Sequence, residues 1–191
     1  MSKLDLIKKS QNLCVEAYEI LEKTNAIEIL SKLGKVDIVG SLKLKLMYRR
    51  DIDLFVVSDV INTDMAKKIT QFFLEANIFK KVTLIDYYKV QIDDMPRGFY
   101  WELIIFYAGY DWKIDVWYLK PEEIYTRMVF DALKKFELAL LKNHSKAEII
   151  LEIKEAYFDG VKYKDNVTGF DIYTAVFDRG INSLEEFAAS R

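Results

Sequence analysis

The sequence predicts an α+β fold in which a mixed β-sheet is flanked by helices and followed by a helical C-terminal part. Three observations predict it. Apolar residues recur at helical steps near the N-terminus, β-branched runs and alternation dominate the middle of the chain, and helical spacing returns in the last third. The chain has 191 residues, of which 51% are hydrophobic and 30% charged, so it can bury the core of one domain with a helical appendage.

The N-terminal helical pattern covers residues 4–33 and ends at the glycine that follows. Its rhythm slips at Thr24 and Asn25, either of which can cap a second helix. Strands are then expected over residues 36–40, 52–57, 81–92, 99–108 and 111–119. The last two strands are separated by Gly109 and Tyr110, which is the spacing of a hairpin.

Further helices are expected between and after these strands. Asn62 or Thr63 caps one that runs to about Ala76, and Pro121 opens another at its first position, which runs to Asn143. The C-terminal part predicts three more, over residues 145–158, over residues 168–180 and after a capping box made by Ser183 and Glu186.

The charge and cysteine content exclude several classes of function. The chain has 28 basic and 30 acidic residues and a formal net charge of −2, so no general attraction to nucleic acid or to an anionic membrane is expected. Cys14 is the only cysteine, which excludes an intrachain disulfide and a cysteine-based metal cluster. The N-terminus lacks the apolar core of a secretory signal, and the longest uncharged apolar stretch, residues 103–110, is too short to span a bilayer. We therefore expect a cytoplasmic protein.

Two aspartates, Asp51 and Asp53, lie one residue apart at the start of a predicted strand. Residues two apart on a strand project to the same side, with Cα atoms about 6.6 Å apart, so both carboxylates face one region of space. Asp115 adds a third acid in the middle of another strand, where a charge is otherwise costly. Mg²⁺ takes such oxygen ligands and commonly shares its shell with substrate phosphates. The alternatives are a solvated strand start for the pair and a water-facing sheet surface for Asp115.

Gly40 closes the first predicted strand, and Ser41 follows it directly. Before a helix, such a turn offers a phosphate a close backbone N–H and a hydroxyl, since glycine permits the approach and a helix N-terminus favours anions. The pattern of the next segment, residues 42–48, leaves its structure open, because LKLKL alternates like a strand whereas Leu42 and Leu46 are also helical i,i+4 partners. Positive charge nearby comes from Lys43, Lys45, Arg49 and Arg50.

These motifs together resemble the nucleotidyltransferase superfamily typified by DNA polymerase β. The matching pieces are Val39-Gly40-Ser41, then Asp51-Ile52-Asp53-Leu54, then Asp115. Their order, a strand, Gly-Ser, a helix and an Asp-x-Asp strand, resembles that superfamily over roughly residues 36–119 and favours a helix over residues 42–48. The helical tail is similar to those of small stand-alone bacterial members.

The resemblance implies an activity and a role for each residue. It makes Asp51 and Asp53 ligands of one or two Mg²⁺ ions on a nucleoside triphosphate, and Asp115 a further ligand or the general base. It implies a nucleotide-binding set of Gly40, Ser41, Lys43 and Arg50. An acceptor hydroxyl would then attack the α-phosphorus, and pyrophosphate would leave with the nucleoside monophosphate transferred.

The resemblance also implies that the chain has two parts, and the sequence departs from the superfamily pattern at one place. Residues 1–120 are expected to form the nucleotidyltransferase-like catalytic domain, and residues 121–191 a helical region packed on it. Many members carry small residues and a serine just before the Asp-x-Asp, where this chain has Tyr48, Arg49 and Arg50. The resemblance therefore implies no base preference. For Lys43 the alternative is a solvated helix face.

Two classes of function follow. As an enzyme, the chain is expected to use a small-molecule acceptor, such as an antibiotic, or a protein side chain, because its near-neutral charge disfavours a nucleic acid. As an alternative, it is a catalytically silent binding module, such as a partner or antitoxin-like subunit. The direction of Asp115 relative to the aspartate pair distinguishes them. The C-terminal tail has helix-turn-helix spacing, but its second helix, which begins LEEFAAS, has two acids and no basic residue before Arg191, which argues against DNA recognition there.

Overall fold

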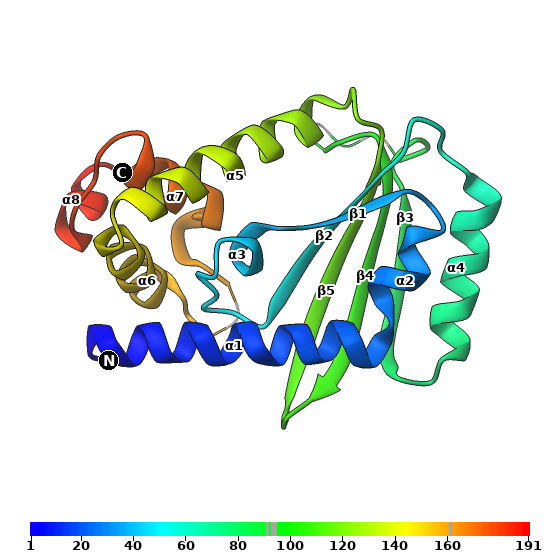
Figure 1. Ribbon diagram of the computed structural model, residues 1–191, viewed down its shortest axis with the longest axis horizontal. Coiled ribbons are helices and arrows are strands. Elements are labelled where there is room, and N and C mark those ends of the chain that lie inside the picture. Colours follow the sequence, from blue (N-terminus) through cyan, green and yellow to red (C-terminus); the bar gives the residue numbers. More distant parts are fainter. Residues whose placement is uncertain (91, 93–94, 161) are drawn as a thin grey trace. The chain divides into compact units, whose positions relative to one another are not determined.

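The computed structural model describes residues 1–90, 92, 95–160 and 162–191 (Figure 1). Contacts between Cα atoms divide the chain into two compact units. The helical unit comprises Met1–Cys14, Gly40–Arg49 and Ala132–Arg191, and the sheet unit comprises Val15–Val39 and Arg50–Asp131. The first helix, α1 (Lys3–Thr24), and the fifth, α5 (Ile124–Lys142), each contribute residues to both units.

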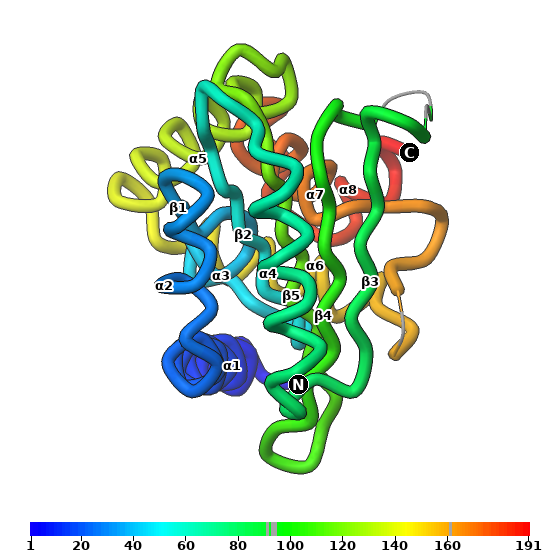
Figure 2. Tube along the Cα trace, turned by 90° about the vertical axis from the view of Figure 1, so that its right-hand side faces the viewer, coloured from blue at the N-terminus to red at the C-terminus, as the bar shows by residue number. Residues whose placement is uncertain are grey.

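The sheet unit contains a five-stranded mixed sheet, as the sequence predicted. Its strands are β1 (Lys35–Val39), β2 (Asp51–Val57), β3 (Phe79–Asp86), β4 (Gly98–Tyr107) and β5 (Tyr110–Leu119). Their order is β1-β2-β5-β4-β3, and β3 lies at an edge beside β4 (Figure 2). The pair β2–β5 is parallel and the other pairs are antiparallel. The fold is therefore α+β with a mixed sheet.

One face of the sheet is apolar and the other carries the charged residues. Along β5, Trp112, Ile114 and Val116 are fully buried, whereas the intervening Lys113 and Asp115 are partly exposed. Helix α4 (Thr63–Glu75) contacts β3, and on the apolar face the indole N–H of Trp101 donates to its Thr70 hydroxyl at 2.8 Å. A short helix, α2 (Ala26–Ser31), packs near β1. The predicted acids Asp51, Asp53 and Asp115 therefore lie on the face opposite to this apolar one.

The N-terminus of α4 provides a first testable prediction. The Asn62 side chain accepts a hydrogen bond from the backbone N–H of Met65 at 2.9 Å, as a capping residue does. Asn62→Ala is expected to lower the free energy of unfolding by about 1 kcal/mol, measured by urea denaturation. Thr63→Ala, one position further into the helix, is the matched control and is expected to have little effect. Equal losses in both variants would contradict a capping role.

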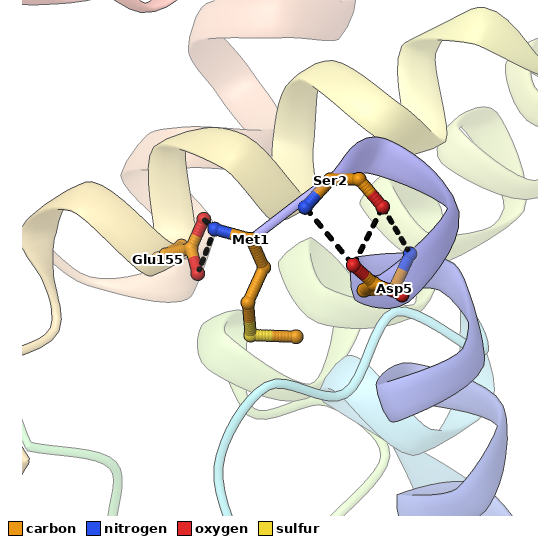
Figure 3. Close-up of polar contacts among 4 residues, drawn as sticks. All are labelled: Met1, Ser2, Asp5 and Glu155. Carbon is orange, nitrogen blue, oxygen red and sulfur yellow. Dashed lines mark hydrogen bonds and ion pairs between the residues drawn. The ribbon is translucent and has the colours of Figure 1, made fainter.

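Besides its parts of α1 and α5, the helical unit contains one short helix and three C-terminal helices. These are α3 (Gly40–Lys43), α6 (Ser145–Tyr157), α7 (Gly169–Phe177) and α8 (Leu184–Ala189), with a 3₁₀ turn over Lys164–Asn166. The rings of Phe136 and Phe177 stack in its core with centroids 4.8 Å apart. The N-terminal ammonium of Met1 pairs with Glu155 at 3.3 Å, which joins the start of α1 to α6 (Figure 3). Over the part of the chain that the structure describes, no helix is both long and apolar enough to cross a membrane.

Three predicted boundaries were wrong for local reasons. The strand predicted over residues 81–92 ends at Asp86, because the Asp86 carboxylate accepts the N–H of Tyr88 at 3.0 Å and turns the chain; residues 91 and 93–94 lie outside the described residues. The β4–β5 turn consists of Ala108 and Gly109, both with positive φ, rather than Gly109 and Tyr110. Pro121 precedes α5 by three positions and does not open it.

The segment over residues 42–48 was predicted only in part. Its helix, α3, ends at Lys43, because Lys45 adopts the left-handed region at φ 57° and breaks the helical path. Leu44, Leu46 and Met47 remain buried even though they belong to neither a helix nor a strand. Tertiary burial, and not a regular repeat, therefore places these apolar residues.

Candidate active site

The three predicted acids meet on the polar face of the sheet. The parallel pairing of β2 and β5 sets Asp53 opposite Asp115. Because alternate residues share a face and paired strands lie about 4.8 Å apart, Asp51 joins them on the same side. Each carboxylate offers an oxygen within 4.8 Å of the others. The structure thus brings together Asp51, Asp53 and Asp115, although Asp115 follows Asp53 by 62 residues in the sequence.

Asp115 is held by two hydrogen-bond donors. The Tyr100 hydroxyl donates to Oδ1 at 2.6 Å, and the Lys113 ammonium donates to Oδ2 at 2.5 Å. Burial raises the pKa of the Asp115 carboxyl and the charge of Asp51 raises it further, whereas the two donors partly offset this rise. The carboxylate is therefore oriented by its neighbours and does not face open water.

Lys113 lies in the acid cluster and pairs with two of its members. It is the cross-strand partner of Asp51, and its Nζ lies 3.4 Å from Asp51 Oδ1 as well as against Asp115. Burial by itself lowers the pKa of the Lys113 ammonium, but the carboxylates of Asp51 and Asp115 outweigh burial and leave the pKa above its ordinary value. The side chain therefore carries a positive charge inside the cluster.

The donor set fits a hard divalent cation. Around an octahedral Mg²⁺ with ligands at about 2.1 Å, oxygens lie about 3 Å apart when adjacent and about 4.2 Å apart when opposite. The oxygens of Asp51, Asp53 and Asp115 all lie within 4.8 Å of one another, so small side-chain rotations bring them to that spacing. Three carboxylates and no sulfur or imidazole is a ligand set typical of Mg²⁺ or Mn²⁺.

Aromatic rings line the sheet beside the acids. The Trp117 ring, two residues after Asp115, lies 4.9 Å from Tyr100 and 6.3 Å from Tyr125. Burial raises the pKa of the Tyr125 hydroxyl, and the charges of Asp53 and Asp115 add to the rise. Burial and the bond to Asp115 likewise raise the pKa of Tyr100, so both hydroxyls stay neutral near pH 7. Trp117 and Tyr100 therefore place aromatic rings on the same face of the sheet as the acid cluster.

The helical unit contains a buried cation that sequence inspection missed. The Lys154 side chain is fully buried, and its ammonium donates to the Ser41 hydroxyl at 2.9 Å, the Tyr173 hydroxyl at 2.7 Å and the Leu46 carbonyl at 2.6 Å. The Ser41 and Tyr173 oxygens are also hydrogen-bonded at 2.9 Å. One feature of the sequence is consistent with this burial. Lys154 lies four residues after the apolar Ile150, so both side chains fall on the same, buried face of α6.

The remaining predicted nucleotide-binding residues have other partners in the structure. Gly40 adopts φ 63°, which glycine tolerates better than other residues, at the start of α3. Lys43 pairs with Glu137 at 3.3 Å in the helical unit. In the sheet unit the Arg50 guanidinium lies over the Tyr110 ring, 3.5 Å from its centroid. On the neighbouring strands of the sheet, Glu102 pairs with Lys81.

Comparison with known proteins identifies the fold. Neither a protein-family model nor a curated protein matches the sequence. A solved structure of a STING-associated CdnE c-di-GMP synthase from Capnocytophaga granulosa is similar, with a TM-score of 0.58 and 14% identity over 92% of this chain and 64% of that one. A structure of the GLD-2–GLD-3 poly(A) polymerase complex is also similar, with a TM-score of 0.52 and 11% identity over 90% of this chain and 57% of that one. The chain therefore has a nucleotidyltransferase fold and spans less than two thirds of these structures.

Proposed function

We propose that the chain is a divalent-metal-dependent nucleotidyltransferase, which transfers a nucleoside monophosphate from a nucleoside triphosphate to a hydroxyl and releases pyrophosphate. The observation that carries the proposal is the convergence of Asp51, Asp53 and Asp115 on one face of a nucleotidyltransferase-like sheet. We assign this chemistry to residues 1–120 and a supporting role to residues 121–191. An inactive binding module has no need to keep three like charges within 4.8 Å.

The acids have distinct parts in this proposal. Asp51 and Asp53 are the principal ligands of Mg²⁺, one or two ions, and Asp115 is a further ligand or the base that accepts the proton of the acceptor hydroxyl. Bound Mg²⁺ supplies charge neutralisation of the triphosphate and of the leaving pyrophosphate. The hydrogen bond from the Tyr100 hydroxyl orients the Asp115 carboxylate before a substrate binds, which reduces the reorganisation that the reaction requires.

Ser41 is the proposed contact for phosphate oxygens, with Gly40, Lys43 and Arg50 as the other nucleotide-binding candidates. A serine hydroxyl has one proton and two lone pairs. Lys154 donates to one lone pair of the Ser41 oxygen, and Tyr173 fills the second if it is the donor in their shared bond. The Ser41 proton is then directed to an anionic ligand. The buried Lys154 charge behind it favours that ligand further.

The acceptor proposed is the hydroxyl of a small molecule, antibiotic-like, with a protein side chain second. The two similar structures are a c-di-GMP synthase and a poly(A) polymerase complex, so the fold supports more than one kind of product. A formal net charge of −2 gives this chain no general attraction to a nucleic acid, which favours the small acceptor.

Removal of the metal tests the proposal directly. We expect at least one of the four ribonucleoside triphosphates to bind at least tenfold more tightly in Mg²⁺ than in EDTA, measured by titration calorimetry on the folded protein. The reason is that the three acids repel the triphosphate unless a cation lies between them. Equal affinity in EDTA, or no binding of any triphosphate by a folded chain, would contradict it and favour a silent module.

A further inference from the structure

The Lys113 ammonium lies against the carboxylates that are proposed to hold the metal. We infer that Lys113 is an internal counter-ion of this site, which competes with the divalent cation for Asp51 and Asp115 and thereby sets the metal affinity of the free protein. This inference rests on the proposed function, because it takes the acid cluster to be a metal site.

The backbone fixes the position of Lys113. It pairs with Asp51 across the parallel strands β2 and β5, and it precedes Asp115 by two residues on β5, so all three side chains share a face. Its Nζ lies 2.5 Å from Asp115 Oδ2 and 3.4 Å from Asp51 Oδ1. The exposed side-chain fractions of Lys113, Asp51 and Asp115 are 29%, 20% and 14%. Solvent therefore screens these charges only in part.

Charge balance explains why a lysine is found among three acids. Like-charged carboxylates at this separation repel each other, and one ammonium relieves part of that repulsion when no metal is bound. A divalent ion that binds oxygens of both Asp51 and Asp115 competes with the Lys113 ammonium for these two carboxylates. Two cations repel at that distance, so binding of the ion requires Lys113 to withdraw on its flexible four-carbon stem.

The sheet provides a matched comparison. Lys81 also pairs with a carboxylate on the neighbouring strand, Glu102, and has the same charge and length as Lys113. Glu102 is not a member of the three-acid cluster. Loss of the Lys81 charge therefore changes the net charge of the protein equally but removes no competitor from the metal site.

The test measures Mn²⁺ binding by titration calorimetry, without nucleotide, to wild type, Lys113→Met, Lys113→Gln and Lys81→Met. We expect Lys113→Met to bind Mn²⁺ at least tenfold more tightly than wild type and Lys81→Met to stay within twofold. Lys113→Gln keeps a hydrogen-bond donor for Asp115 without the charge, so it is also expected to bind more tightly. Circular dichroism shows whether each variant is folded. If Lys113→Met is not, Lys113→Gln replaces it in the comparison.

The outcomes separate this inference from the proposed function. If wild type binds Mn²⁺ and the Lys113 variants bind it no more tightly, Lys113 is not a competitor and the metal site stands. If Lys81→Met gains as much affinity as Lys113→Met, the effect is one of net charge and the inference is overturned. If neither wild type nor the Lys113 variants bind Mn²⁺, the metal site and the inference fail together.

Discussion

Replacement of both Asp51 and Asp53 by Asn is expected to abolish metal-dependent binding of nucleoside triphosphates, with affinity at least about 100-fold weaker than wild type. Asn keeps the size of each side chain but removes two of the three charges that attract the cation. Because a hard divalent ion prefers charged oxygen ligands, the remaining Asp115 is insufficient to hold it. The measurement is calorimetric titration of each triphosphate in Mg²⁺ and in EDTA.

Asp111→Asn is the matched control for this double variant. Asp111 lies on β5, the strand that pairs with β2, but at an exposed position where it pairs with Lys80. We expect its nucleotide affinity to equal that of wild type. If the double variant retains Mg²⁺-dependent binding, or if Asp111→Asn loses it as well, the assignment of Asp51 and Asp53 as metal ligands is wrong.

Lys154→Met is expected to separate nucleotide binding from stability. Loss of a charged group behind the proposed phosphate contact is expected to weaken triphosphate binding by about 30-fold, since hydrogen bonds to charged groups contribute about 1.5–3 kcal/mol. Met has a similar volume and carries no desolvated charge, which offsets the lost donors to Ser41, Tyr173 and the Leu46 carbonyl. We therefore expect the free energy of unfolding to change by less than about 2 kcal/mol.

The control for Lys154 is Lys146→Met on the same helix. Lys146 also donates to a backbone carbonyl, that of Val176 at 3.2 Å. We expect normal nucleotide binding from this variant. Titration calorimetry measures the triphosphate affinity of both variants, and urea denaturation measures their free energies of unfolding. Unchanged triphosphate affinity in a folded Lys154→Met protein would show that the Lys154 charge does not support nucleotide binding through Ser41.

Together these variants distinguish the enzyme from a silent module. The silent module was expected to have Asp115 directed away from the aspartate pair. The structure instead places the Asp115 carboxylate within 4.8 Å of both, where Tyr100 and Lys113 hold it. This geometry favours the enzyme, and an acceptor screen with the triphosphate that binds in Mg²⁺ is the next step.

The sequence by itself determined most helices and strands and the face of each strand on which the acids lie. Period-two alternation assigned Asp51 and Asp53 to one face of β2 and placed Asp115 mid-strand on β5. Caps such as Asn62 and Thr168 marked helix starts correctly, because their side chains bond to backbone groups three residues away. These features depend on spacing over a few residues, which backbone geometry fixes locally.

Only the tertiary structure decided which elements are neighbours. The parallel pairing of β2 with β5 sets Asp53 beside Asp115 and Lys113 beside Asp51, although two strands and a helix lie between them in the chain. Burial of Lys154 against Ser41 joins residues that are 113 positions apart. Strand partners and buried contacts are selected by the packing of the whole core, which no local period encodes. The acid cluster was therefore predictable in outline, whereas Lys113 beside it and the buried Lys154 of the helical unit were not.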